Sequence, residues 1–298
     1  MLSVYPNMTK DATAGVRQRE PIMTLKQFSA QFIDWVDHSH SLEKKTRAYY
    51  RHGWNLLSTT DLANRKLDGI KNRDSDTLTF PGGPANANTA LRTLRRMLAY
   101  AEDLEIIKHV PEIKLRKEWP RSVAMTRNQA DLIIMRMPDG DARDALSILR
   151  ATGMRPKEVF GMRWEFIDHE AKIYHNPNGK TRNSRRAVPL LDPSSSILAR
   201  RHFTRGSPHA GWVFPGVSSC GHIVTIQKAF TKARTLAGLP RELVLYTARH
   251  GCATDLAAVL STKELMNIGG WSDAATAMRY QHPETTNLQS RLDQIKRA

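Results

Sequence analysis

Four residues in the second half of the chain have side chains that could act together on a phosphodiester: Arg155, Lys180, Arg249 and Tyr280. A guanidinium forks onto two phosphate oxygens and stays protonated, so two arginines could stabilise a charged transition state without a metal ion. A lysine that is stripped of water can release a proton to a departing oxygen. A phenol has a pKa of about 10 in water, and nearby cations favour its nucleophilic phenolate form. These residue types therefore indicate phosphoryl-transfer chemistry.

Three sequence segments around these residues form ordered motifs. They are ATGMRPKEVFGMRWEFID around Arg155, YTARHGCATDLA around Arg249, and IGGWSDAATAMRYQHP around Tyr280. Trp271 follows Arg249 by 22 residues and precedes Tyr280 by 9. The order and spacing resemble the signature boxes of the tyrosine recombinase (phage-integrase) family, and Lys180 lies where that family has a lysine in a hairpin turn. One box alone is a weak signal, whereas the ordered set is specific.

The resemblance implies a role for each matched residue. Tyr280 is expected to attack DNA and form a 3′-phosphotyrosyl bond, while Arg155 and Arg249 hold the phosphate. Lys180 is expected to protonate the leaving 5′ oxygen, with Lys172 as a nearby alternative. Because the new ester conserves the energy of the broken one, rejoining is expected to need no ATP or other cofactor.

Two positions differ from the family's usual residues, which are histidines. Tyr246 and Trp271 stand there instead, and each can donate a hydrogen bond but neither exchanges a proton near neutral pH. We expect both in the catalytic site. Tyr246 would act as a donor to a phosphate oxygen or as packing beneath Arg249, and Trp271 as a donor or as a packing surface. Glu158 and His250 are expected to support the site, Glu158 by orienting cationic side chains and His250 as a catalytic or a core hydrogen-bonding group.

The charge balance of the chain indicates a polyanionic partner. Its 298 residues include 45 Lys and Arg against 29 Asp and Glu, which gives a net charge of +16. Double-stranded DNA is the expected partner, and an anionic membrane surface is the weaker alternative because no basic amphipathic anchor joins an apolar run. No apolar run has the length of a membrane span and no signal-peptide pattern is present, so we expect a soluble, cytoplasmic protein. Two cysteines and no zinc-like Cys/His spacing predict neither a disulfide framework nor a metal site.

Helical periodicity predicts an all-helical first domain, for which the resemblance implies a SAM-like fold. Capping residues and apolar spacing indicate helices that begin at Thr24 and Ser41, a short helix over residues 61–70 and another around residues 91–101. A basic, proline-containing linker follows, with a domain boundary near Trp119. The expected divisions are a mobile tail over residues 1–23, a helical core DNA-binding domain over residues 24–118 and a catalytic domain over residues 119–298.

The second domain is predicted to be mixed. The β-prone stretches WEFID, AKIYH and RRAVPL stand between predicted helices, and the turn-rich stretch NPNGKTRNS separates the last two. Helices around a small antiparallel sheet form an α+β domain, so the whole chain is predicted to be mostly α, with two domains. The resemblance implies that a last helix, from Glu284, docks onto a neighbouring protomer.

Basic residues on the predicted helices and in the linker are the candidates for contacts with DNA phosphates. A merely solvated helix face is the alternative, and the net charge favours phosphate contact. The candidates are Lys44, Lys45, Arg47, Arg51, Arg92, Arg95, Arg96, Arg116 and Lys117.

The activity that the resemblance implies is that of a DNA strand transferase, a site-specific recombinase or integrase that works as a tetramer on paired DNA sites. A type IB topoisomerase-like enzyme would share the nucleophile and the arginines but would relax supercoils as a monomer. A catalytically impaired DNA-binding relative is the other alternative, because Tyr246 stands in place of a histidine.

Overall fold

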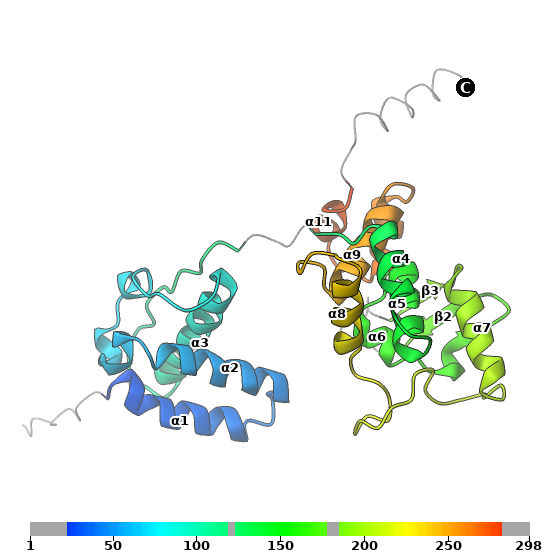
Figure 1. The fold of residues 1–298 in the computed structure, drawn as a ribbon. Coiled ribbons are helices and arrows are strands. Elements are labelled where there is room, and N and C mark those ends of the chain that lie inside the picture. The colour runs from blue at the N-terminus through cyan, green and yellow to red at the C-terminus, as the bar shows by residue number, and fades with distance from the viewer. Residues whose placement is uncertain (1–22, 119–122, 178–184, 282–298) are drawn as a thin grey trace, which may run out of the picture. The chain divides into compact units, whose positions relative to one another are not determined.

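A computed structural model describes residues 23–118, 123–177 and 185–281 of the chain, which folds into two compact units (Figure 1). The units comprise residues 1–120 and 121–298, and each has its own hydrophobic core. The predicted boundary falls after residue 118. Trp119, and all of the expected N-terminal tail except Met23, lie outside the described residues.

Over residues 23–118, the first unit contains three α-helices: α1 (Leu25–His38), α2 (Lys44–Leu57) and α3 (Pro84–Asp103). Thr24 and Gln27 begin α1 as predicted. The backbone N–H of Thr24 donates to the Gln27 side chain at 2.8 Å, and the N–H of Gln27 donates to the Thr24 hydroxyl at 3.2 Å. Phe28 and Phe32, one turn apart on α1, are fully buried against α3 and its neighbours. Truncation of such a ring to alanine costs about 3–5 kcal/mol, so these residues fix α1 in the unit.

The stretch between α2 and α3 is not the short α-helix predicted over residues 61–70. It forms 3-10 turns at Asp61–Asn64 and Leu67–Gly69. Arg65 and Lys66, between these turns, are extended and lie against the start of α1, where the N–H of Leu25 donates to the Arg65 carbonyl at 2.9 Å. The prediction was wrong because this contact between distant segments uses backbone groups that a continuous helix would need.

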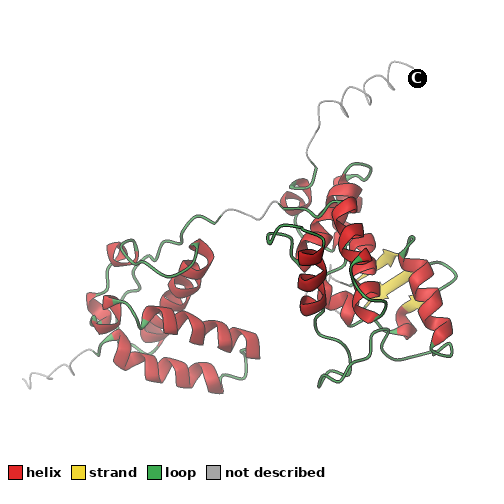
Figure 2. Ribbon diagram, in the orientation of Figure 1, coloured by secondary structure: helices red, strands yellow, loops and turns green. Residues whose placement is uncertain are grey.

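The second unit surrounds a small antiparallel sheet with helices (Figure 2). Its helices are α4 (Arg127–Met135), α5 (Asp141–Thr152), α6 (Pro156–Phe160), α7 (Ser194–Thr204), α8 (Gln227–Leu236), α9 (Leu245–Ala257), α10 (Thr262–Gly269) and α11 (Ala274–Met278). Its strands, in the order β1-β2-β3, are β1 (Ile167–Asp168), β2 (Ile173–Asn176) and β3 (Arg186–Pro189). The mostly α fold with a small antiparallel sheet is confirmed. Only the end of WEFID is a strand, because Trp164–Phe166 forms a 3-10 turn.

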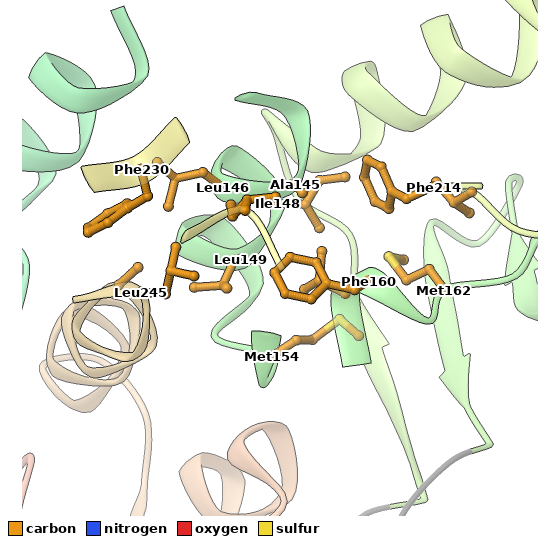
Figure 3. Close-up of a cluster of buried hydrophobic side chains, with 14 of the residues drawn as sticks. Ala145, Leu146, Ile148, Leu149, Met154, Phe160, Met162, Phe214, Phe230 and Leu245 are labelled. Carbon is orange, nitrogen blue, oxygen red and sulfur yellow. The ribbon is translucent and has the colours of Figure 1, made fainter. Parts of the chain in front are cut away.

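Helix α5 is the centre of the second core. Ala145, Leu146, Ile148 and Leu149 are all fully buried, on more than one side of the helix (Figure 3). Residues 144–150 of α5 are all buried, so this part of the helix lies inside the core, and α5 contacts α4, α6, α7 and α9. The chain that leaves α5 at Thr152 therefore starts from a rigid position, and it leads directly to Arg155.

Candidate active site

Arg249 lies at the junction of three helices. It belongs to α9 and is 1% exposed. Its two terminal nitrogens donate to the carbonyl oxygens of Gly153, at 2.7 Å, and Gly269, at 2.6 Å. These carbonyls end α5 and α10, where helix carbonyls lack partners in their own helix and attract a cation. The guanidinium therefore ties the ends of two helices to a third.

The turn formed by Gly269 and Gly270 positions Trp271. Gly270 has a φ of 64°, a left-handed conformation that favours glycine. A Cβ atom on Gly269 would lie 2.3 Å from the Trp271 ring, so a side chain has no room there. The ring centroid is 5.1 Å from the guanidinium carbon of Arg249, within reach of a cation–π attraction. The glycine pair thus lets Trp271 lie against the buried arginine.

Arg155 reaches the same turn from another element. It precedes α6, and its side chain is 34% exposed. One terminal nitrogen donates to Glu158 Oε1 at 2.8 Å, and the other donates to the carbonyl of Gly270 at 3.2 Å. Since Arg249 contacts the adjacent Gly269, the two predicted catalytic arginines converge on one two-residue turn.

A third arginine, Arg186 on β3, completes this network and was not among the predicted site residues. Its side chain is 6% exposed and that of Glu158 is 7% exposed. Arg186 donates to both carboxylate oxygens of Glu158, at 3.1 and 3.3 Å, and to the carbonyl of Ile268 at 2.6 Å. Burial alone would raise the pKa of Glu158, but hydrogen bonds and charge from Arg186 and Arg155 outweigh it and lower that pKa. Glu158 is therefore a buried anion between two arginines, and its orienting role stays a prediction.

A signal for Arg186 was present in the stretch RRAVPL. Residues two apart on a strand point to the same face, so Arg186 shares a face with Val188. Val188 is fully buried on β3. A charged side chain on the buried face of a strand needs a charged or hydrogen-bonding partner, and this requirement could have placed Arg186 in the site.

Tyr280 belongs to a row of rings that joins α9 to the chain after α11. Its ring stacks on Trp271, with centroids 5.1 Å apart and planes at 22°. Its hydroxyl oxygen lies 2.5 Å from Nδ1 of His250. Tyr246, one turn before His250 on α9, meets the His250 ring edge-on at 4.9 Å and is 44% exposed. This aromatic row, formed by Trp271, Tyr280, His250 and Tyr246, contains three of the predicted catalytic residues and one predicted supporting residue.

Burial shifts the titration of both groups in the Tyr280–His250 contact. Burial raises the pKa of Tyr280, and the positive charge of Arg249 opposes only part of that rise. Burial, followed by the charge of Arg249, lowers the pKa of His250 below its ordinary value. At neutral pH the phenol is therefore protonated and the imidazole is neutral, so the hydroxyl can donate to Nδ1.

The segment that carries Tyr280 is held at both ends. Asp273 caps the start of α11 through its side chain. Gln281, directly after Tyr280, donates to the carbonyl of Leu260 at 3.1 Å and accepts from the Thr262 hydroxyl at 2.7 Å. These contacts fix the position of the phenol relative to α10.

Lys180 and the expected C-terminal helix from Glu284 lie outside the described residues. The alternative lysine, Lys172, precedes β2, whereas Arg186 pairs with Asn176 at the other end of that strand. Four residues of strand span about 13 Å. Lys172 is thus remote from the end of the sheet that meets Glu158, and Lys180 stays the prediction.

Three of the predicted DNA-binding arginines hold the fold of the first unit together. Arg47 donates to three carbonyls at and beyond the end of α1, at 2.7, 3.0 and 3.1 Å. Arg116 donates to three carbonyls between Ser75 and Leu78, at 2.9 to 3.2 Å. Arg95 donates to the carbonyl of Ile113 at 2.5 Å. These guanidinium groups satisfy the backbone of the unit, and their contact with DNA stays a prediction.

The other predicted DNA-binding residues lie nearer the surface of the first unit. Lys44, Lys45 and Lys117 are exposed. The three remaining arginines form ion pairs with at least one exposed partner: Arg51 with Asp37 at 2.6 Å, Arg92 with Glu118 at 3.2 Å and Arg96 with Asp103 at 3.6 Å. Such pairs contribute at most about 1 kcal/mol, so a phosphate can compete for these arginines.

Two kinds of feature are absent from the parts of the chain that the structure describes. No helix there has the length and apolar character needed to cross a membrane. Among the same residues, no cluster of three His, Cys, Asp or Glu side chains could hold a metal ion.

Comparison with known proteins gives one family and several similar folds. A model of the phage integrase family matches residues 124–287, while no curated protein matches the sequence. The Tn1549 transposon integrase, in complex with transposon right end DNA, has a TM-score of 0.69 at 18% identity, covering 92% of this chain and 100% of that one. A lambda integrase dimer bound to a COC′ core site has a TM-score of 0.70 at 18% identity, covering 87% and 77%. A lambda integrase tetramer bound to a Holliday junction has a TM-score of 0.69 at 17% identity, covering 88% and 78%.

Proposed function

The chain belongs to the phage integrase family, and we propose that it is a site-specific DNA recombinase that cuts and rejoins DNA through a 3′-phosphotyrosyl bond on Tyr280. The observation that carries this proposal is that two arginines and the tyrosine meet at one turn. Arg155 and Arg249 contact the carbonyls of Gly270 and Gly269, and the next residue stacks on Tyr280. Two cations and a phenol are thereby gathered from three separate segments, which suits attack on a phosphodiester.

In this mechanism the oxygen of Tyr280 forms a bond to phosphorus while the bond from phosphorus to the 5′ oxygen breaks. Arg155 and Arg249 stabilise the negative charge that spreads over the equatorial phosphate oxygens. Each guanidinium has five N–H donors, and the contacts to carbonyls use only some of them. Lys180 supplies the proton that the leaving 5′ oxygen needs. Reversal of the same step by a new 5′ hydroxyl rejoins a strand without ATP.

The exposure of the two arginines sets an order for their contacts with DNA. The side chain of Arg155 is 34% exposed, whereas Arg249 is 1% exposed and lies beneath Trp271. A phosphate can therefore reach Arg155 directly. Contact with Arg249 requires Trp271 and the segment that carries Tyr280 to shift, and DNA binding supplies the energy for that shift.

The partners follow from the chemistry. The net charge of +16 suits binding to double-stranded DNA by phosphate contacts from both units. Exchange between two duplexes requires four strand cuts, so four protomers are needed on a pair of sites. The structures of the lambda integrase dimer on a core site and tetramer on a Holliday junction are consistent with such an assembly. The C-terminal helix from Glu284 is the proposed contact between protomers.

The experiment is to trap the covalent intermediate. Duplexes that bind the protein are selected from a random-sequence library and rebuilt with a nick beside each candidate scissile phosphate, so that the cleaved end diffuses away. Wild-type protein should form an adduct that survives detergent, and Tyr280→Phe should bind equally but form none. The proposal fails if the wild-type protein forms no adduct on any selected site. Relaxation of a supercoiled plasmid that lacks the selected site would instead favour the topoisomerase-like alternative.

A further inference from the structure

The hydroxyl of Tyr280 already has a hydrogen-bond partner that could take its proton. The Tyr280 oxygen lies 2.5 Å from Nδ1 of His250, a short contact for a neutral O–H and a ring nitrogen. Within the described ranges, the Tyr280 hydroxyl makes no other hydrogen bond. Any attack by this oxygen on phosphorus therefore begins from a phenol that is bonded to an imidazole.

The position of His250 is built by its surroundings. The residue lies within α9, directly after the buried Arg249, and its backbone carbonyl accepts from the Thr254 hydroxyl at 3.0 Å. The His250 ring lies between two others: Tyr246 meets it edge-on at 4.9 Å, and the Tyr280 ring is 5.6 Å away. A ring held on both sides has little freedom to turn away from the phenol.

We propose that His250 is the catalytic base that accepts the phenolic proton of Tyr280 during strand cleavage, an inference that rests on the proposed function. In the step, the Tyr280 O–H bond breaks and its proton moves to Nδ1 of His250. The same oxygen forms the bond to phosphorus, and the bond from phosphorus to the 5′ oxygen breaks. The leaving 5′ oxygen takes its proton from Lys180. On rejoining, the incoming 5′ hydroxyl returns that proton to Lys180 as its oxygen displaces Tyr280, which recovers its own proton from the imidazolium.

The charged and titratable groups around the pair set its resting state, a neutral imidazole and a protonated phenol. Arg249 and Tyr246 on α9 face the pair, together with Arg279, which precedes Tyr280. Burial and Arg249 lower the pKa of His250, so the base is neutral and ready at physiological pH. Burial raises the pKa of Tyr280, so few molecules carry a phenolate without help. Repulsion from Arg249 makes the imidazolium short-lived, which favours return of the proton.

The catalytic test compares His250→Asn with the wild-type protein. The Asn side chain offers an oxygen near the place of Nδ1 but is not a base. Single-turnover adduct formation on a nicked duplex from the binding selection is measured from pH 5 to pH 9. The wild-type rate should rise with pH until His250 is neutral and then level off. The His250→Asn rate should be about 10²–10⁴-fold lower at neutral pH and should still rise above pH 8, where ionisation of Tyr280 begins to replace the base.

A matched control isolates the base from general effects of the substitution. His202→Asn makes the same change at another half-buried histidine of the second unit, whose ring nitrogen bonds to the Pro208 carbonyl at 3.1 Å. This variant should keep the wild-type pH profile. DNA affinity and thermal melting are measured for every variant, and His250→Gln replaces His250→Asn if the latter does not bind DNA.

A second readout needs no DNA. In protein labelled with ¹⁵N-histidine, the Nδ1 chemical shift of His250 reports the hydrogen bond, and Tyr280→Phe should move it. An unmoved shift overturns the inference, as does a His250→Asn rate and pH profile equal to wild type. If the hydrogen bond is present but the wild-type protein forms no adduct, it is the proposed recombinase function that fails, and the role of His250 in attack falls with it.

Discussion

Arginines in both units donate to backbone carbonyls, but the consequences differ. In the first unit, Arg47 and Arg116 each satisfy three carbonyls of turns and chain ends. In the second unit, Arg155 and Arg249 donate to carbonyls of one glycine turn whose next residue stacks on Tyr280. The residue type and the kind of hydrogen bond are the same. A candidate catalytic arginine is therefore distinguished from a structural one by the group beside it. The charge of the surrounding sequence does not distinguish the two kinds of arginine.

The largest effect should come from the arginines beside the tyrosine. Arg155→Ala and Arg249→Lys should each slow single-turnover cleavage by about a hundredfold or more. Each variant removes a preorganised guanidinium that stabilises the phosphate charge, and the single ammonium group of a lysine in place of Arg249 cannot bind two phosphate oxygens in the same way. Affinity for DNA should fall less than the rate. Arg201→Lys is the matched control, since Arg201 is a buried arginine paired with Asp144 on elements outside the site. Equal losses of rate and affinity would make Arg155 and Arg249 ordinary phosphate anchors.

The network behind the site should respond through stability. Glu158→Gln leaves Arg186 buried without its anion, so the free energy of unfolding at neutral pH should fall by about 3 kcal/mol, as measured by urea denaturation. Because the pKa of Glu158 is lowered in the folded state, its stabilisation is present above the ordinary carboxyl pKa and is lost as pH falls through the lowered value. The difference between wild type and Glu158→Gln should therefore shrink below about pH 4.

A control for this prediction is Glu264→Gln. Glu264 caps α10 together with Ser261 at the surface, and glutamine keeps the hydrogen bonds of a capping box. Its stability should stay close to that of the wild-type protein. If Glu158→Gln behaves in the same way, the contacts among Glu158, Arg155 and Arg186 contribute little, and the arginines are held by the glycine turn alone.

Local chemistry was sufficient to predict the start of α1, whereas the helix predicted to begin at Ser41 begins at Lys44, with Glu43 as its N-cap. Thr24 caps α1 together with Gln27, three residues on, and Thr126 caps α4 with Gln129 in the same way. The 61–70 segment was mispredicted because its conformation depends on a contact with the start of α1, far away in the sequence. Local patterns thus predict an element where its own residues satisfy its backbone, and they fail where a distant segment does so.

The same distinction applies to the site. The spacing of Arg155, Arg249 and Tyr280 follows a family pattern, and the structure brings these residues to one turn. Arg186 was missed because its partners lie on other elements, Glu158 on α6 and the Ile268 carbonyl on α10, and only tertiary packing brings them to β3. Arg47 was predicted from its charge to contact DNA phosphates, and the charge did not reveal that its side chain is long enough to reach back to the end of α1.

Substitutions of Tyr246 test whether the exposed end of the aromatic row takes part in catalysis. Its ring is 44% exposed and packs against His250, and its hydroxyl makes no hydrogen bond within the described residues. If that hydroxyl donates to a phosphate oxygen, Tyr246→Phe should raise the cleavage barrier by about 1.5–3 kcal/mol, as expected for a hydrogen bond to a charged group. Tyr246→His should keep activity and add an inflection near pH 6.5, to be measured in single-turnover rates across pH. Equal rates for wild type and Tyr246→Phe would leave Tyr246 a packing role only.

The smallest effects should separate the exposed lysines from the arginines that hold the first unit together. If the whole protein contacts about six to ten phosphates, its affinity should fall about 10³–10⁵-fold between 50 and 200 mM salt. Replacing both Lys44 and Lys45 with alanine should lower the slope of that dependence by about two and leave the melting temperature unchanged, since both are exposed.

Arg47→Ala should have the opposite effect. It leaves three backbone carbonyls without their hydrogen-bond donor, so the free energy of unfolding should fall by about 1–3 kcal/mol while the salt slope stays the same. Fluorescence anisotropy at several salt concentrations, with thermal melts of each variant, measures both quantities. A slope that falls by about one in Arg47→Ala would show that this guanidinium leaves its carbonyls for a phosphate, and the division between structural and DNA-binding arginines would then no longer hold in the first unit.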